Sequence, residues 1–156
     1  MATTSTYETL REAQEELIEA LTPDSFASVP FMRYRGESDF RTWANEHHTA
    51  CMRRFWVRDL FDYDYPEIAA YDVEWTVGRC EVVTAYPTTG RYGQDNSADL
   101  QDVIREDMHN IEEAIGARAG RYANAHAVLQ STEVETDEDV TFLSMTYTFR
   151  YYRSVS

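Results

Sequence analysis

The amino-acid sequence predicts an α+β fold, in which two main helices pack on a mixed or antiparallel sheet that ends in a long C-terminal hairpin. Three observations support this prediction. Residues 97–115 carry apolar side chains at helical spacing, residues 140–152 carry them at strand spacing, and 43% of the 156 residues are hydrophobic. A chain of this length and composition can bury its own core, so we expect residues 1–156 to form a single domain.

The first sixty residues predict one helix and two short strands. Residues 6–21 repeat apolar positions with a period near 3.6, which indicates an amphipathic helix, and Pro23 prevents its continuation. Short strands are expected at 31–35 and 52–60. The segment between them, 36–50, has no clear period and is expected to be irregular.

Residues 71–86 predict the first long strand, with Gly78 as a site for a β-bulge. The preceding segment, 61–67, alternates aromatic with acidic residues and then meets a proline, which favours an exposed loop or an edge strand. The following segment, 87–96, is rich in turn residues and is expected to be a loop.

The segment 97–115 predicts the second main helix, and Gly116 stands where a C-terminal cap belongs. The opposite side of this helix is expected to be solvated and strongly negative. The apolar stripe consists of Leu100, Val103, Ile104, Met108, Ile111 and Ile115, and the acidic side consists of Asp99, Asp102, Glu106, Asp107, Glu112 and Glu113.

The C-terminal forty residues predict a hairpin with arms at 126–135 and 140–152 and an acidic tip at 135–139. The return arm gives the strongest strand signal of the sequence, because its large side chains alternate with serine, threonine and arginine. These large residues are Leu143, Met145, Tyr147, Phe149 and Tyr151.

The charge of the chain is lopsided, with 28 acidic residues against 14 arginines and no lysine, which gives a formal charge of −14. A surface this acidic repels the phosphates of duplex DNA and is therefore not expected to bind it, although DNA could slide past it without adhering. The absence of lysine fits either a GC-rich genome or a high-salt cytoplasm. Two cysteines are too few for a disulfide framework, and no apolar run is long enough for a membrane span, so we expect a protein of the reducing cytoplasm with no membrane partner.

Three groups of residues could in principle bind a cation. Glu46, His47, His48 and Cys51 combine donor types that zinc accepts, and acids recur in two runs, but neither the first group nor the runs have the spacing of a known metal motif. We therefore assign no metal and no cofactor, and interpret these segments as polar loops. The acidic runs are Asp62, Asp64 and Glu67 in one loop and Asp137, Glu138 and Asp139 in the hairpin tip.

Catalytic signatures are missing from the sequence. It contains no nucleophile elbow, phosphate-binding loop or dinucleotide fingerprint. His109 is expected on the polar side of the second helix and His126 at the start of a strand, where both are more typical of surface residues than of a general base. We therefore expect a protein that is not an enzyme.

The order of elements resembles the tail terminator, or tail-completion, proteins of long-tailed bacteriophages. The resemblance lies in a short N-terminal helix, a long strand that leads into a Tyr-Pro turn, an acidic helix and an aromatic-rich strand near the C-terminus. The segments that carry it are 71–77, 81–87, 99–115 and 141–151.

The resemblance implies a virion protein, assembled in the host cytoplasm, that forms a hexameric ring. Such a ring caps the tail tube, ends tail polymerisation and meets the head-tail connector or neck, and DNA passes through its lumen without specific binding. Candidate lumen-facing acids are Asp99, Asp102, Glu106, Asp137, Glu138 and Asp139. Candidate residues for contact between subunits are Leu143, Met145, Tyr147, Phe149 and Tyr151, because a long hairpin can offer a strand edge to a neighbour.

Two alternatives remain open at the level of sequence. The first is another neck, connector or baseplate component, which would also arrange small domains in a ring and would differ in the virion proteins that it contacts. The second is a cone-shaped α+β domain that binds a small ligand or acts as an enzyme, with Trp43, Trp56 and Trp75 lining a pocket.

Overall fold

The computed structural model describes residues 7–22, 29–60, 68–69, 73–88, 97–118 and 125–154. Within these ranges, no helix is both long enough and apolar enough to cross a membrane. The predicted α+β class is confirmed. The elements are the helices α1 (Tyr7–Glu19), α2 (Phe40–Glu46) and α3 (Ser97–Arg118) and the strands β1 (Met32–Arg33), β2 (Arg54–Asp59), β3 (Ile68–Ala69), β4 (Val73–Pro87), β5 (Ala125–Asp137) and β6 (Val140–Ser154).

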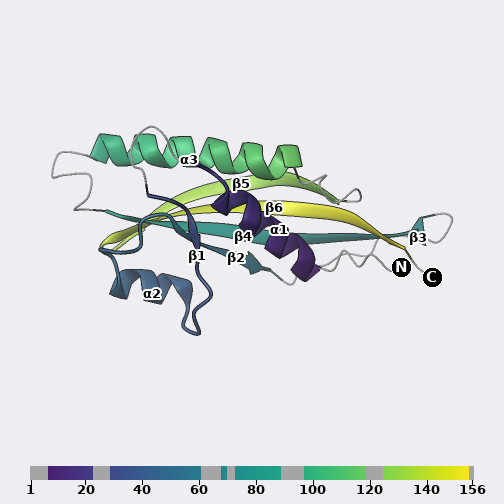
Figure 1. The fold of residues 1–156 in the computed structure, drawn as a ribbon, viewed down its shortest axis with the longest axis horizontal. Coiled ribbons are helices and arrows are strands. Elements are labelled where there is room, and N and C mark those ends of the chain that lie inside the picture. The colour runs from purple at the N-terminus through teal and green to yellow at the C-terminus, as the bar shows by residue number, and fades with distance from the viewer. Residues whose placement is uncertain are drawn as a thin grey trace.

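The strands form one mixed sheet in the order β1-β2-β4-β6-β5, and β3 pairs with the start of β4. The pair β1–β2 is parallel and the other pairs are antiparallel. Helices α1 and α3 cover one face of the sheet, and the short helix α2 lies against the opposite face (Figure 1). The sheet is therefore the middle of three layers.

The longest ladder joins β4 to β6, from Val73 opposite Ser154 to Pro87 opposite Val140. Its register is continuous through Gly78, which faces Phe149, so the predicted bulge at Gly78 is wrong. The irregularity lies instead on β5, where the register shifts between Leu129 and Ser131. An extra residue disturbs one ladder on an edge strand and would disturb two on a central strand such as β4.

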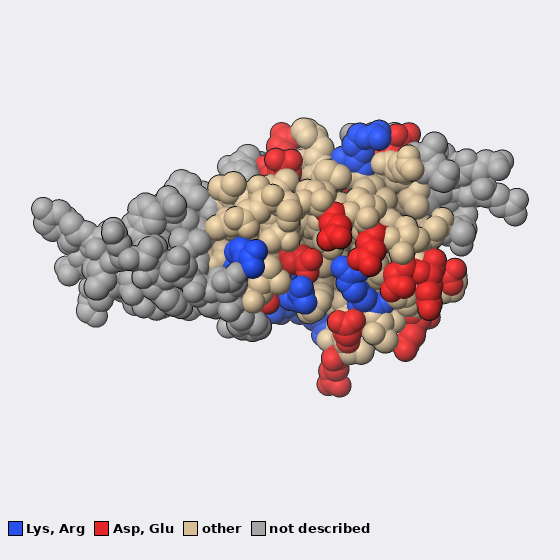
Figure 2. All heavy atoms as spheres, turned by 180° about the vertical axis from the view of Figure 1, so that it is seen from behind, with Lys and Arg blue, Asp and Glu red and all other residues tan. Residues whose placement is uncertain are grey.

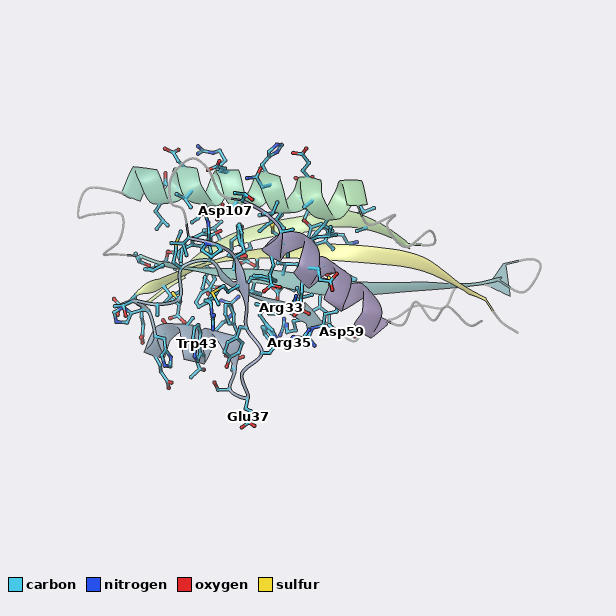
Figure 3. The ribbon with its side chains drawn as sticks, viewed as in Figure 1. Arg33, Arg35, Glu37, Trp43, Asp59 and Asp107 are labelled. Atoms are coloured by element: carbon cyan, nitrogen blue, oxygen red, sulfur yellow. The ribbon has the colours of Figure 1, made fainter. Side chains whose placement is uncertain are left out.

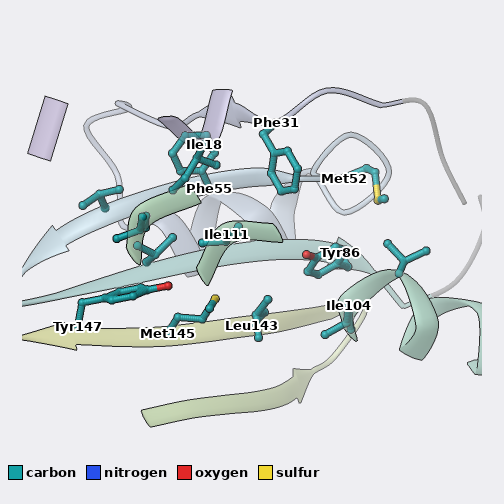
Figure 4. Close-up of a cluster of buried hydrophobic side chains, with 14 of the residues drawn as sticks. Ile18, Phe31, Met52, Phe55, Tyr86, Ile104, Ile111, Leu143, Met145 and Tyr147 are labelled. Carbon is teal, nitrogen blue, oxygen red and sulfur yellow. The ribbon is translucent and has the colours of Figure 1, made fainter. Parts of the chain in front are cut away.

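The larger core lies between the sheet and helices α1 and α3 (Figure 4). The predicted apolar stripe of the second helix is confirmed, because its side chains are buried there and Met108 is partly buried. Alternate residues of the central strands point to the same side, as expected from the pleat of a sheet. These strand residues include Phe55, Val57, Val82, Leu143, Met145 and Tyr147.

Helix α2 was not predicted, because seven residues are too few for a helical period to stand out in the sequence. Asp39 caps its N-terminus by accepting a hydrogen bond from the Thr42 backbone N–H at 3.2 Å. The helix buries Phe40 and Ala44 completely in a second, smaller core. A helix this short depends on such tertiary contacts, which a reading of local pattern cannot include.

Two further expectations for the second helix are wrong. Helix α3 continues to Arg118, so Gly116 lies inside the helix rather than at its cap. Asp107 is only 1% exposed, although its neighbours on the helix surface suggested a solvated position. A buried carboxylate needs partners, and the structure supplies them from a different part of the chain.

The partner of Asp107 is Arg53, which is completely buried and has a backbone φ of 57°. Its Nε and Nη2 atoms donate to the two carboxylate oxygens of Asp107 at 2.8 and 2.7 Å, and the hydroxyl of Tyr86 donates to Oδ2 at 2.7 Å. Burial raises the pKa of Asp107, and the hydrogen bonds from Arg53 and Tyr86 act in the opposite direction because they favour the charged form.

Arg53 also binds elements other than α3. Its Nη1 donates to the Val29 carbonyl oxygen at 3.2 Å, and its guanidinium lies 5.2 Å from the centre of the Phe31 ring. Its backbone N–H donates to the Ala85 carbonyl oxygen at 2.9 Å. A residue with positive φ is strained, so the surrounding contacts must hold it in place. Arg53 thereby joins α3, β4 and the segment before β1.

We expect Arg53→Met and Asp107→Leu each to lower the free energy of unfolding by about 3–5 kcal/mol, because each leaves one buried group without its partner. The double variant should lose less than the sum of the two. Urea denaturation of the four proteins gives this comparison. The exposed pair Asp102–Arg105 on the same helix is the control, and its removal should change stability by less than about 1 kcal/mol. If Arg53→Met and Asp107→Leu each cost less than about 1 kcal/mol, and the double variant costs the sum of the two, the role of the buried pair would be contradicted.

Candidate functional site

The outer arm of the hairpin, β5, is an exposed edge of the sheet. Among the described strands it pairs with β6 alone. Every residue from 131 to 139 is exposed, whereas residues 140–145 of the paired strand are buried. Val134 is 49% exposed although it lies opposite Leu143, which is fully buried. The core therefore ends at β6, and β5 presents both of its faces to solvent over this stretch.

The side chains of β5 form two rows. One row consists of Thr132, Val134 and Thr136, which lie opposite Met145, Leu143 and Thr141 on the face covered by α1 and α3. The other row, which we call the acidic row, consists of Glu133, Glu135 and Asp137 on the face that carries α2. Glu138 and Asp139 continue the negative charge through the turn, where Glu138 has a φ of 53°. Figure 2 shows acidic side chains gathered toward the right-hand end of the molecule in that view.

Helix α2 and the turn after it support the acidic row from one side. Arg41 lies 3.6 Å from a carboxylate oxygen of Glu135, and the Asn45 amide donates to Asp137 at 3.3 Å. His48 lies 4.0 Å from Asp139. Positions 41, 45 and 48 share a helical spacing, and positions 135, 137 and 139 alternate on the hairpin. Successive contacts along the helix and the strand have nearly the same spacing, because four helical residues rise about 6 Å and two strand residues about 6.8 Å.

At the opposite edge of the sheet, the outward backbone donor of the edge strand β1 is bonded to a side chain. Because Met32 and Tyr34 donate their backbone N–H groups to the carbonyl oxygens of Arg53 and Phe55, the N–H of Arg33 between them points outward. It donates to the Glu19 carboxylate of α1 at 3.3 Å, and the Arg33 Nε donates to the same carboxylate at 2.8 Å. Figure 3 shows the side chains of Arg33 and Arg35 close to α1. Edge β1 therefore has a side chain bonded to its outward donor.

A second carboxylate of α1 also pairs with Arg33. Glu15 of α1 is fully buried and forms ion pairs with Arg35 and, at 3.5 Å, with Arg33. Arg11, one turn earlier on the same helix, lies 3.9 Å from it. The hydrogen bond from Arg33 lowers the pKa of Glu19 below its ordinary value of 4.5. The two edge strands are thus chemically different, since β1 has two residues and a bonded outward donor, and β5 is long, exposed and acidic.

The six candidate lumen acids fall on two separate elements. Asp102 is paired with Arg105 at 3.1 Å and Glu106 is half-buried, whereas all three hairpin-tip acids are exposed. Asp99 lies in α3, and its side chain is outside the described part of the chain. The tip (Asp137, Glu138 and Asp139) therefore holds the larger exposed negative charge.

Three of the five candidate residues for contact between subunits are buried inside this chain. Leu143, Met145 and Tyr147 are 0–1% exposed and lie in the chain's own core, so their side chains cannot meet a neighbour in this conformation. Burial also raises the pKa of the Tyr147 hydroxyl. The side chains of Phe149 and Tyr151 lie outside the described residues. The sequence pattern identified a strand but could not show that β6 is central and β5 is the edge.

The residues considered for metal binding do not converge in the part of the chain that the structure describes, where no group of three or more His, Cys, Asp or Glu side chains could hold one ion. Cys51 is buried and its thiol donates to the His48 carbonyl oxygen at 3.5 Å. Burial raises the pKa of this thiol to about 11, so it stays protonated at neutral pH. His47 stacks on Trp43. Asp62, Asp64 and Glu67 lie outside the described residues.

The remaining histidines and tryptophans are placed as follows. His109 is exposed and lies 3.4 Å from Glu113, in agreement with the polar side predicted for it, and the side chain of His126 is outside the described residues. Trp43 and Trp56 pack against the smaller core beneath α2. The guanidinium of Arg54 covers Trp43 at 5.0 Å. The side chain of Trp75 is outside the described residues.

We expect Glu19→Gln to reduce stability by about 0.5–1.5 kcal/mol at neutral pH, because it removes the charge that binds Arg33. The folded-state pKa of Glu19 is lowered, so its stabilising effect is complete above pH 4.5 and is lost as the pH falls through the folded-state value. Urea denaturation at several pH values should show the difference from the parent shrinking in acid. Glu37→Gln, in an exposed loop, is the control, and an equal effect of both variants at every pH would contradict the assignment.

No protein-family model matches this sequence, and no curated protein matches it significantly. Its function is therefore inferred from the fold and from the chemistry of its surface.

Proposed function

We propose that this chain is a structural, non-catalytic protein of a tailed virus. In this role it assembles into a hexameric ring that caps the tail tube, stops tail polymerisation and joins the tail to the head or neck. The observation that supports the proposal most is the open edge strand β5, which is thirteen residues long and exposed from residue 131 to the hairpin tip.

An open edge of this length is unusual for a protein that acts alone. Unpaired N–H and C=O groups on an edge strand attract other strands, and monomeric proteins shorten or cover their edges, or place charges and bulges on them, for that reason. This chain bonds the outward donor of β1 to Glu19 but leaves β5 exposed. The contrast favours a role in which β5 meets another molecule.

The charge of β5 argues against a simple two-fold dimer through this edge. If two copies paired β5 with β5, Glu133, Glu135 and Asp137 of both copies would lie along one seam, together with the acids of both tips. Like charges in adjacent strands destabilise their pairing. A ring would therefore join its copies through other, unlike surfaces, which generate closed rings when they meet in succession, and would leave β5 for another component of the virion.

The formal charge of −14 per copy suits the proposed passage of DNA, since a lumen that repels phosphates lets the duplex slide. The α3 acids and the tip acids are the two candidate linings. A neck, connector or baseplate component would use the same open edge and would differ in its neighbours within the virion.

The first test of the proposal is the oligomeric state. We expect native mass measurement and particle imaging at high protein concentration to show rings, either alone or on the ends of purified tail tubes. Tubes capped by the protein should stop growing when tube subunits are added. A strict monomer that neither joins tubes nor stops their growth would rule out the proposed role.

The second test concerns the lining of the lumen. The variant with Asp137, Glu138 and Asp139 changed to arginine and the variant with Asp99, Asp102 and Glu106 changed to arginine alter the formal charge equally. We expect one of them to keep rings intact yet slow DNA exit, because each new phosphate contact steepens the dependence of log affinity on log salt by about 0.9. The other variant serves as its control. If both assemble and eject DNA as the parent does, the charge does not line a pore.

A further inference from the structure

We infer that β5 receives an extended strand from a different, basic polypeptide, which adds a sixth strand beyond β5 in the main row of the sheet. The binding surface, which we call the β5 edge, consists of residues 128–137. The inference rests on the proposed function only in placing the partner within the virion, since the strand-binding surface itself is read from the fold.

Beyond the register shift at Gln130, residues 131–137 of the β5 edge keep a continuous register with β6, and they have the length and exposure that strand addition requires. Its described residues from 130 to 137 are all exposed, and β6 is its only strand neighbour in the described part of the chain. Main-chain hydrogen bonds from an added strand would supply affinity, and the alternating side chains would supply specificity. About four to eight paired residues suffice for such a contact.

The β5 edge also exposes apolar side chains that an added strand would cover. Among the described residues only three large hydrophobic side chains are exposed, and two of them, Val128 at 62% and Val134 at 49%, lie on β5. They lie on opposite faces of the strand. A partner strand would therefore shield one valine on each face with its own side chains.

The acidic row defines the chemistry of the partner. Glu133, Glu135 and Asp137 lie on one face and repeat every second residue, about 6.8 Å apart. A strand with arginine or lysine at alternate positions would place opposite charges next to them, which stabilises adjacent strands. A neutral strand would bring no opposite charge to the row and an acidic strand would be repelled by it, so the row selects among partners.

Another copy of this chain is a poor donor for that strand. Pairing of β5 with β5 brings acidic rows together, and β1, at the other edge of the sheet, has only two residues and an outward N–H already bound to Glu19. The occupant that fits is therefore a different protein with a basic extended segment.

The test uses a synthetic peptide of about eight residues in which arginine alternates with threonine and valine. We expect it to bind the full-length protein, as measured by fluorescence anisotropy, and to shift the amide NMR signals of β5. A second peptide with the same side chains but N-methylated alternate amides keeps the charge and removes backbone donors. It should bind at least about tenfold more weakly, the change expected when about 1.4 kcal/mol of interaction is lost.

Matched charge reversals locate the site. Glu133→Arg with Glu135→Arg should weaken the peptide at least about tenfold, whereas Glu112→Arg with Glu113→Arg on exposed α3 positions should change binding less than about twofold. Glu133→Arg alone leaves the Arg41–Glu135 contact intact and should still weaken binding. Weaker binding by this variant would therefore not be explained by loss of that contact.

The outcomes separate the inference from the proposed function. Equal binding of the N-methylated peptide, or equal weakening by the α3 reversals, would mean general charge attraction and overturn the inference. If the β5 reversals instead break rings of the parent protein, a second copy occupies the edge, which overturns the inference but keeps the ring. If the parent binds the peptide at β5 yet never forms rings or caps tubes, the proposed function fails and the β5 edge remains a strand-binding site.

Discussion

The buried contact between Arg53 and Asp107 is the constraint on which the arrangement of the layers depends. It fixes α3 above the sheet at a point where the chain enters β2, and Tyr86 ties the same carboxylate to β4. A carboxylate and a guanidinium can be buried only when they satisfy each other, so the two elements have one favourable alignment. Hydrophobic contacts alone are less directional and would tolerate sliding of α3 along the strands. The ion pair therefore fixes the position of α3 along the strands, which the apolar contacts of the core define less strictly.

The sequence predicted the features that repeat along the chain. The apolar stripe of α3 and the alternation in β6 span many residues, so their periods are evident from the order of residues alone. The short helix α2 and the burial of Asp107 were missed for a different reason. Phe40 and Ala44 are helical because they pack on the sheet, and Asp107 is buried because Arg53, far away in the sequence, pairs with it. Such long-range causes leave no local pattern.

The candidate site likewise combines a feature that the sequence predicted with one that depends on the whole fold. The acids of the hairpin tip were identified from sequence because charge is a property of the residue itself. The order of strands is a property of the whole fold, and it places the return arm of the hairpin, which held the candidate contact residues, between two other strands. Leu143 and Met145 belong to the core because β6 lies between two strands, while the polar arm β5 forms the surface. A search for apolar alternation will point to the buried arm of a hairpin whenever the other arm is the edge.

The register shift at Gln130 decides which chemistry the hairpin shows to its surroundings. Leu129 faces the larger core with Tyr147, and if the same residues formed a regular strand without a bulge, every second position after Leu129 would face the same way. Glu133, Glu135 and Asp137 would then point toward the helical layer, and Thr132, Val134 and Thr136 would take the other face. The single extra residue resets the phase of the strand by half a period. The negative face of the hairpin is therefore encoded by the number of residues between two positions as much as by their identity.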